Sequence, residues 1–347
     1  LCPSLEQSTQ TEASASHQVK NVPLSFLIIR FSAIGDVVLT TPVIRSLKRQ
    51  FPDAEIHYVT KASNKAVLLH NPHISHIHVL EDDLGKTISA LKQHSFDHIF
   101  DLHHNLRSWR VKRALGVAST SFRKKNLDKW LLCQPLLRRF ARPIEHVVQR
   151  YGDTLKSVEA TLDHGGLDVF LTSELNGWAA GELAQTLPKT PRIAVVLGAT
   201  YATKRWITDY FPKTLNQYRG SVVLIGGPDT TEEAKAIADE LEIPFYNAVG
   251  KYGLLKSAAL MKGCDIVLSH DTGFMHIAAA FGQNVISIWG NTVPEFGMTP
   301  YNTEHSIIEV KDLSCRPCSK IGHSSCPKGH FDCMRSIMPE EVLKKIQ

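Results

Sequence analysis

Long hydrophobic runs are absent from the 347-residue sequence. The longest apolar stretches, such as LSFLII from Leu24 and IAVVLGA from Ile193, are far shorter than the roughly 18–20 residues that a membrane-spanning helix needs. We therefore expect no segment of this chain to cross a bilayer.

The common signatures of nucleotide-binding loops are also missing. The sequence contains neither the G-x-G-x-x-G fingerprint of dinucleotide-binding folds nor the G-x-x-x-x-G-K-[ST] pattern of a P-loop. It has no D-x-D pair of the kind that holds a catalytic metal on a sugar diphosphate. These absences exclude the best-marked ways of binding a nucleotide, and they predict that any nucleotide is held without a resident metal or cofactor.

Cysteine is present in an odd number, seven, which argues against an extracellular disulfide framework and for reduced thiols. The first 22 residues are polar and lack the apolar core of a secretory signal, so we interpret residues 1–22 as a disordered leader. Both observations predict a cytoplasmic protein.

The net charge is only +5, but it is unevenly distributed. The segment from Arg107 to Arg150 contains twelve Lys or Arg and two acidic residues, Asp128 and Glu145, a net charge of +10. Such an excess predicts an anionic partner, although a solvated helical face is an alternative. Nucleic acid is not expected, because few base-stacking aromatics interrupt the segment, namely Trp109, Phe122, Trp130 and Phe140.

From Leu24 onward, short β-branched runs alternate with amphipathic stretches, the first of which predicts a helix over residues 36–50. This alternation is typical of βαβ units and predicts an α/β protein with two doubly wound, Rossmann-like domains. We place the domains at residues 23–170 and 192–347, with a linker over 171–191. Helical periodicity is lost over residues 163–177, and Pro188 and Pro191 bracket a short connector. The carboxyl ends of both sheets should then face a central cleft, where parallel sheets bind ligands.

Three polar motifs follow predicted strands. Asp36 opens the first helix and is either a helix cap or a general base facing the cleft. A loop early in the second domain carries Thr200 and Lys204, which are suited to a phosphate. The third motif lies at the start of an apolar helix and contains Asp271, Thr272, Gly273 and His276. These residues could bind an anion at the positive end of the helix dipole. The alternative is an N-cap aspartate beside a core histidine.

The tail contains Cys315, Cys318, Cys326 and Cys333 close to two histidines. One C-x-x-C pair with two further thiols is compatible with a structural zinc site, but the second pair lacks the usual spacing. A compact subdomain with buried thiols is the alternative.

Five segments together resemble glycosyltransferase family nine, the heptosyltransferases: FSAIGDVVLTTP, DLHHNLRS, GATYATKRW, DTGFMHIAAAFG and WGNTVPEFGMTPY. The resemblance covers the chain from about Leu24 to its end. It implies a GT-B fold with an N-terminal acceptor domain, a C-terminal nucleotide-sugar domain, and inverting transfer from ADP-heptose without a metal. Many members have a proline after the K-x-W element, where this chain has Ile207.

Carried onto this sequence, the resemblance implies that Asp36 deprotonates the acceptor hydroxyl and that Thr200 and Lys204 bind phosphate. It places Asp271, Thr272, Gly273 and His276 at the nucleotide. On the acceptor side we expect His103, Asn105 and Arg107, with Arg138 and Arg139 from the basic segment.

The expected function is transfer of heptose to the lipopolysaccharide inner core by a protein bound peripherally to the inner membrane. The expected acceptor is lipid A-core or another anionic glycan. The alternative is a GT-B transferase that uses another nucleotide-sugar on a different cell-surface glycan. This alternative stays open because none of the motifs indicates which sugar is bound.

Overall fold

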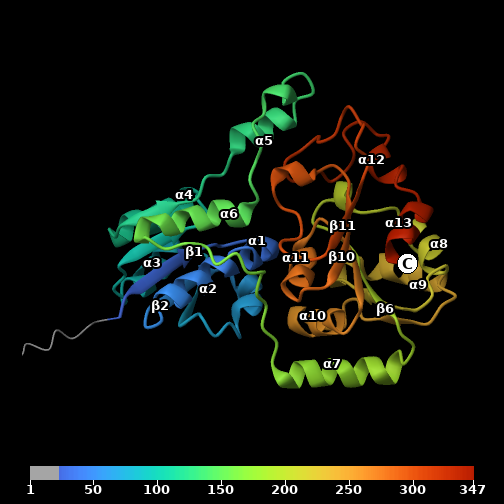
Figure 1. The fold of residues 1–347 in the computed structure, drawn as a ribbon, viewed down its shortest axis with the longest axis horizontal. Coiled ribbons are helices and arrows are strands. Elements are labelled where there is room, and N and C mark those ends of the chain that lie inside the picture. The colour runs from blue at the N-terminus through green and yellow to red at the C-terminus, as the bar shows by residue number, and fades with distance from the viewer. Residues whose placement is uncertain (1–22) are drawn as a thin grey trace, which may run out of the picture.

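The computed structural model of the chain describes residues 23–347 and contains two separate β-sheets, each with all its strands parallel (Figure 1). The predicted leader, residues 1–22, lies outside the described residues. Within residues 23–347, no helix is both long enough and apolar enough to cross a membrane.

The first sheet has the strand order β3-β2-β1-β4-β5. Its strands are β1 Ser25–Ile29, β2 Glu55–Thr60, β3 His76–Val79, β4 His98–Asp101 and β5 Ser119–Ser121. The helices that belong to this half are α1 Ile34–Val38, α2 Thr41–Gln50, α3 Leu84–Leu91, α4 Leu106–Leu115, α5 Asn126–Leu132 and α6 Val147–Gly152.

The second sheet has the order β11-β10-β9-β6-β7-β8. Its strands are β6 Arg192–Val196, β7 Ser221–Ile225, β8 Phe245–Asn247, β9 Ile266–His270, β10 Asn284–Trp289 and β11 His305–Glu309. The remaining helices are α7 Ser173–Thr186, α8 Tyr210–Leu215, α9 Thr231–Asp239, α10 Leu254–Lys262, α11 Gly273–Ala280, α12 Asp332–Arg335 and α13 Pro339–Ile346. The predicted pair of doubly wound α/β domains is confirmed.

The central strands are buried because their sequences are nearly continuous apolar runs, as expected for parallel sheets covered on both faces. All five residues of β1 and of β7 are buried. One hydrophobic cluster contains residues of both domains, including Val37 and Val38 of α1 and Met275 and Ile277 of α11. The two helices that follow β1 and β9 therefore pack against each other where the domains meet.

The helix predicted over residues 36–50 is instead two helices, α1 and α2, which meet at Leu39 and Thr40. Pro42 lies in the first turn of α2, and a proline cannot donate the backbone hydrogen bond that would continue α1. The hydroxyls of Thr40 and Thr41 donate instead to the carbonyls of Val37 and Val38, at 2.7 Å each. The break gives α1 a direction of its own, toward α11.

The segment placed in the linker contains helix α7, although its sequence lacks clear periodicity. Only Ala179 and Leu183 of α7 are buried, and Gly177 and Gly181 interrupt the pattern, which explains the weak signal. The helix packs against α10, and in Figure 1 it runs along the edge of the second domain. The ring centroids of Trp178 and Tyr252 are 4.9 Å apart.

Candidate active site

Asp36 lies in the first turn of α1, directly after the loop that leaves β1. Its Oδ2 is 2.7 Å from Nη2 of Arg30 and accepts a hydrogen bond from the backbone N–H of Ala33 at 3.1 Å. The carboxylate thus stabilises the start of α1, as the helix-cap alternative supposes, and it also forms an ion pair. Its side chain is 23% exposed, so the carboxylate is not fully enclosed.

The electrostatic environment keeps Asp36 ionised. Burial by itself would raise the pKa of Asp36, but the charge of Arg30, its hydrogen bond and that of Ala33 outweigh burial and lower the pKa below the usual range of aspartate. Arg30 is itself fixed, because its Nη1 donates to the carbonyl of Leu102 at 2.6 Å and its guanidinium lies 5.9 Å from the ring centroid of Tyr151.

The start of α11 lies against the start of α1. A Cβ atom placed on Gly273 would be 3.2 Å from the backbone nitrogen of Gly35, and one placed on Gly35 would be 2.7 Å from Cδ2 of His276. Glycine at both positions therefore allows this approach between domains. The residues that the sequence singles out at two distant motifs, 35–36 and 271–276, meet here.

His276 is buried, and its Nδ1 has no hydrogen-bond partner among the described residues. Burial lowers the pKa of His276 to about 4, although the carboxylate of Asp271 opposes this. The ring is therefore neutral at physiological pH and carries a single N–H donor. Thr272 caps α11 through its backbone alone, since its hydroxyl accepts no N–H of the helix.

Lys204 and Asp271 form an ion pair, with Nζ 2.5 Å from Oδ2. Nζ also lies 3.3 Å from the backbone carbonyl of Asp271, and the hydroxyl of Thr292 donates to the same carboxylate at 2.8 Å. Lys204 is thus held at the end of β9, next to the start of α11. Thr200 is exposed on the loop after β6, whereas the neighbouring Thr203 is buried and bonded to Asn291.

The predicted acceptor-side residues lie in different environments. His103 packs on Phe31, with ring centroids 4.9 Å apart, and burial together with the charges of Arg30 and Lys124 lowers its pKa to about 4. Asn105 caps α4, because its Oδ1 accepts the N–H of Ser108 at 2.9 Å. Arg107 is exposed on α4. The side chain of Asn105 is therefore occupied within the loop, while His103 lies beside the charged pair Arg30 and Asp36.

The basic segment is largely at the surface around α5, which projects from the first domain in Figure 1. Arg138 donates to the carbonyl of Ser314 in the second domain at 2.9 Å, and the guanidinium of Arg139 stacks on Phe140 at 4.8 Å from the ring centroid. Arg150 differs from these, because it is buried and donates to the carbonyls of Glu145, Arg123 and Lys124. The segment is therefore not a uniform solvated face.

Arg30 and Lys129 are basic residues near Asp36 that were not among the predicted site residues. Arg30 follows β1 directly and forms the ion pair described above. Lys129 on α5 lies 5.7 Å from the ring centroid of Phe296 in the second domain, and burial, with the charge of Arg150, lowers its pKa to about 8. A charged residue that ends an apolar strand run is the signal that points to Arg30, whereas nothing local distinguishes Lys129.

The cysteines of the tail surround a small cavity of about 20 Å³, which is also lined by His330 and Arg316. Sγ of Cys315 lies 3.7 Å from Nε2 of His330, and Cys333 is buried, which raises the pKa of its thiol to about 12. In residues 23–347, the tail contributes no three metal-ligating atoms that all lie within 4.8 Å of one another. Zinc binding by Cys315, Cys318, Cys326 and Cys333 stays a prediction.

A family model described as glycosyltransferase family 9 (heptosyltransferase) matches residues 84–328. The chain belongs to this family. The resemblance inferred from the five segments is confirmed, and the matched region includes all of the second-domain motifs and the DLHHNLRS segment.

Other family 9 proteins are similar over different lengths. A lipooligosaccharide heptosyltransferase 2 of Campylobacter jejuni strain 81116 is 30% identical over 158 residues, which are 43% of this chain and 48% of that protein, so the match spans about half the length of this relative. A family 9 structure from Veillonella parvula has a TM-score of 0.76 at 21% identity, covering 93% of this chain and 96% of the other.

A third match is the Escherichia coli structure of an ADP-heptose lipopolysaccharide heptosyltransferase II. Its TM-score is 0.70 at 19% identity, and the superposition covers 93% of this chain and 97% of the other. These two solved structures confirm the GT-B fold of this family 9 chain.

Proposed function

We propose that this protein transfers heptose from ADP-heptose to the inner core of lipopolysaccharide. The observation that carries the proposal is the meeting of Asp36, on α1 of the first domain, with the start of α11 in the second domain. Membership of family 9 and the relatives named for lipopolysaccharide heptosyl transfer support this choice of substrates. Residues 23–170 would bind the acceptor and residues 192–347 the nucleotide-sugar.

In the proposed reaction, Asp36 removes the proton of an acceptor hydroxyl while the hydroxyl oxygen attacks the anomeric carbon of the donor. The bond from that carbon to the diphosphate oxygen breaks, and ADP leaves with the bonding electrons. A single displacement from the face opposite the diphosphate inverts the anomeric centre. General-base help of this kind is worth roughly 10²–10⁴-fold in rate.

The start of α11 is proposed to bind the diphosphate. The first N–H groups of a helix have no partner within the helix, and the helix dipole favours a negative charge there. The Thr272 hydroxyl is not used as a cap, and Lys204 is held beside the same helix start. Together with His276 and the exposed Thr200, these groups would stabilise the charge that grows on the leaving diphosphate.

Metal-independent transfer fits this set of residues, because the sequence has no D-x-D pair and the cationic Lys204 lies beside the proposed diphosphate site. Lys204 and Arg30 both lie at the junction of the two domains. We expect transfer to persist in excess EDTA. A complete loss that magnesium restores would contradict the proposed mechanism.

The acceptor is proposed to be anionic. Lys124 and Lys129 lie close enough to Asp36 for its charge to affect their pKa values, so the surroundings of the base carry positive charge. The phosphates and acidic sugars of lipid A-core would be attracted by such a field. This supports the placement of the acceptor on the first domain.

The region around α5 is proposed to contact the cytoplasmic surface of the inner membrane. Leu136 is 87% exposed and Phe140 is 59% exposed, and both lie beside Arg138 and Arg139. Apolar side chains among arginines are typical of protein surfaces that bind anionic lipid. A lipid-linked acceptor would then be presented at the side of the first domain.

The test is incubation with a panel of nucleotide-sugars and a lipid A-core acceptor that lacks heptose, with mass spectrometry of the product. We expect addition of one heptose from ADP-heptose. Addition of a different sugar, with none from ADP-heptose, would favour the alternative of another nucleotide-sugar and another glycan.

A further inference from the structure

Four histidines gather on one face of the first sheet, away from the candidate active site. His57 lies on β2, and His76 and His78 lie on the edge strand β3. In the parallel register His57 pairs with His76, and His78 lies two residues further along β3, so these three side chains share a face of the sheet. His94, between α3 and β4, completes the group.

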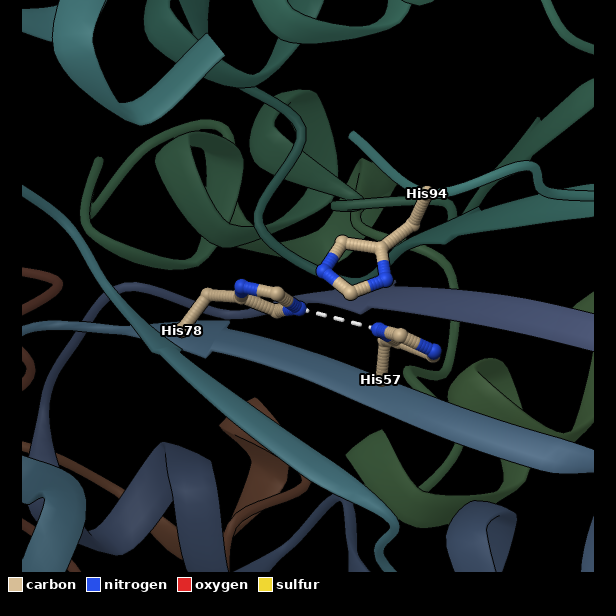
Figure 2. Close-up of side chains that lie close together, drawn as sticks. All are labelled: His57, His78 and His94. Atoms are coloured by element: carbon tan, nitrogen blue, oxygen red, sulfur yellow. Dashed lines mark hydrogen bonds between the residues drawn. The ribbon is translucent and has the colours of Figure 1, made fainter. Parts of the chain in front are cut away.

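Three of these rings converge on one point, as Figure 2 shows. Nδ1 of His57 lies 2.9 Å from Nε2 of His78. One nitrogen of each of His57, His78 and His94 lies within 4.8 Å of the other two. The ring centroids of His57 and His94 are 4.6 Å apart, and those of His78 and His94 are 5.2 Å apart. Three imidazole nitrogens in such an arrangement need only small movements to bind one ion.

Hydrogen bonds within the cluster satisfy only one of the two ring nitrogens of His57. Its Nδ1 and the Nε2 of His78 share one hydrogen bond, while its Nε2 is buried without a hydrogen-bond partner among the described residues. The nearest charged group is the carboxylate of Glu55, with Oε2 3.5 Å from that nitrogen. A buried polar atom without a partner is costly and asks for an explanation.

We propose that His57, His78 and His94 bind a divalent transition metal of the zinc type. Imidazole nitrogen suits zinc, copper and nickel, and three histidines supply three of the four ligands of a tetrahedral zinc ion, with water or a neighbouring side chain as the fourth. With the metal on Nδ1 of His57, the opposite N–H of that ring points to Glu55, which is the carboxylate–histidine–metal pairing that orients metal ligands. The second group of possible ligands, Glu55, His57 and His76, shares His57 and lies on this other side of the ring.

The role of this metal is structural. In the register of the sheet, His57 is paired with Leu27 in the middle of β1. Arg30 lies three residues beyond Leu27, which corresponds to about 10 Å at the rise of a strand. The metal would join β2, the edge strand β3 and the segment after α3. It would fix the edge of the first sheet without touching Asp36.

The experiment uses protein without a polyhistidine tag, stripped of metal by EDTA and dialysed. So that thiols of the tail do not compete for the added zinc, the parent protein carries Cys315→Ser and Cys318→Ser. Zinc is titrated calorimetrically into this parent, into a His78→Gln/His94→Gln variant of it, and into a His305→Gln variant, which removes an exposed histidine of the second domain.

We expect one zinc per parent chain and a rise in its melting temperature with zinc. Both effects should persist in the His305→Gln variant, and affinity should fall by more than about 100-fold in the double variant, since loss of an outer-shell partner alone costs about 10–100-fold. Zinc binding of equal affinity in the parent and the double variant would overturn the proposal, as would a parent that binds none. Neither outcome depends on the transfer activity proposed above.

Discussion

The carboxylate of Asp36 and the guanidinium of Arg30 lie 2.7 Å apart at the carboxyl end of β1, and both side chains are mostly buried. The pair keeps the pKa of the proposed base low in a place where burial alone would raise it. It also fixes the direction of the carboxylate, because Arg30 is bound to the carbonyl of Leu102.

Replacing Arg30 with Gln should raise the pKa of Asp36, because burial then acts on that carboxyl without the opposing charge. A base works in its ionised form, so activity is lost as the pH falls through this pKa. The acidic limb of the pH profile of kcat/KM should therefore move to higher pH. An Arg30→Lys variant keeps the charge and should move the acidic limb less. Unchanged pH profiles in both variants would mean that Arg30 does not affect the pKa of the catalytic base.

The same ion pair makes stability depend on pH. The folded-state pKa of Asp36 is below its unfolded value of about 3.9, so the pair stabilises the fold above that pH and this stabilisation is lost as the pH falls through the folded pKa. Asp36→Asn should therefore reduce the free energy of unfolding at pH 7 more than at pH 3. Urea denaturation at the two pH values measures this difference, and equal losses would contradict the ion-pair account.

A methyl group on Gly35 should separate α1 from α11, because it would lie 2.7 Å from Cδ2 of His276. We expect Gly35→Ala to lower kcat by about 10²-fold, the size of effect that a displacement of about 1 Å produces at a reacting centre. Steady-state kinetics and thermal unfolding of the variant measure the two effects separately.

Gly177→Ala is the matched control, since nothing lies within 4 Å of the added methyl on α7. An alanine in a helix interior is favoured over glycine by roughly 0.5–1 kcal/mol, so this variant should be slightly more stable and fully active. If Gly35→Ala were as active as Gly177→Ala, close approach of the two helix starts would not be needed for turnover.

Removing Arg138, Arg139 and Arg142 as a triple Ser variant should weaken binding to anionic vesicles. Each basic residue near such a surface contributes about 1 kcal/mol, so the partition coefficient should fall by about 10²-fold at low salt. Binding should also become less sensitive to salt. Vesicle sedimentation measures both, and calorimetry should show unchanged affinity for the nucleotide-sugar.

Lys344→Ser with Lys345→Ser removes two exposed cations from α13 and serves as the control, which should bind vesicles as the unmodified protein does. Equal losses in both variants would mean that overall charge, and not the region around α5, sets membrane binding. A fall in donor affinity in the triple variant would place the basic segment at the nucleotide.

The sequence predicted the strands well, because parallel strands buried on both faces are continuous apolar runs, as in SVVLI of β7. It did not predict α7, whose outward face and two glycines hide the helical period, nor the short strand β5, which is made of Ser and Thr. It selected Asp36 and His276 separately, but their proximity depends on how the two domains pack. Arg30 follows an apolar strand run directly and could have been selected from the sequence, whereas nothing local distinguishes Lys129, whose contact with Phe296 depends on the packing of the two domains.

The most direct test of the account compares Asp36→Asn with Lys204→Ala and His276→Ala. Calorimetric titration of ADP-heptose is combined with turnover on a lipid A-core acceptor. We predict that Asp36→Asn binds the donor normally and loses at least about 10²-fold in turnover, since an amide is no base at neutral pH. Both other variants should lose donor affinity as well as turnover, because their partner, the diphosphate, is charged before and during the reaction. A folded Asp36→Asn protein with nearly full turnover would contradict the account and leave Asp36 as a helix cap.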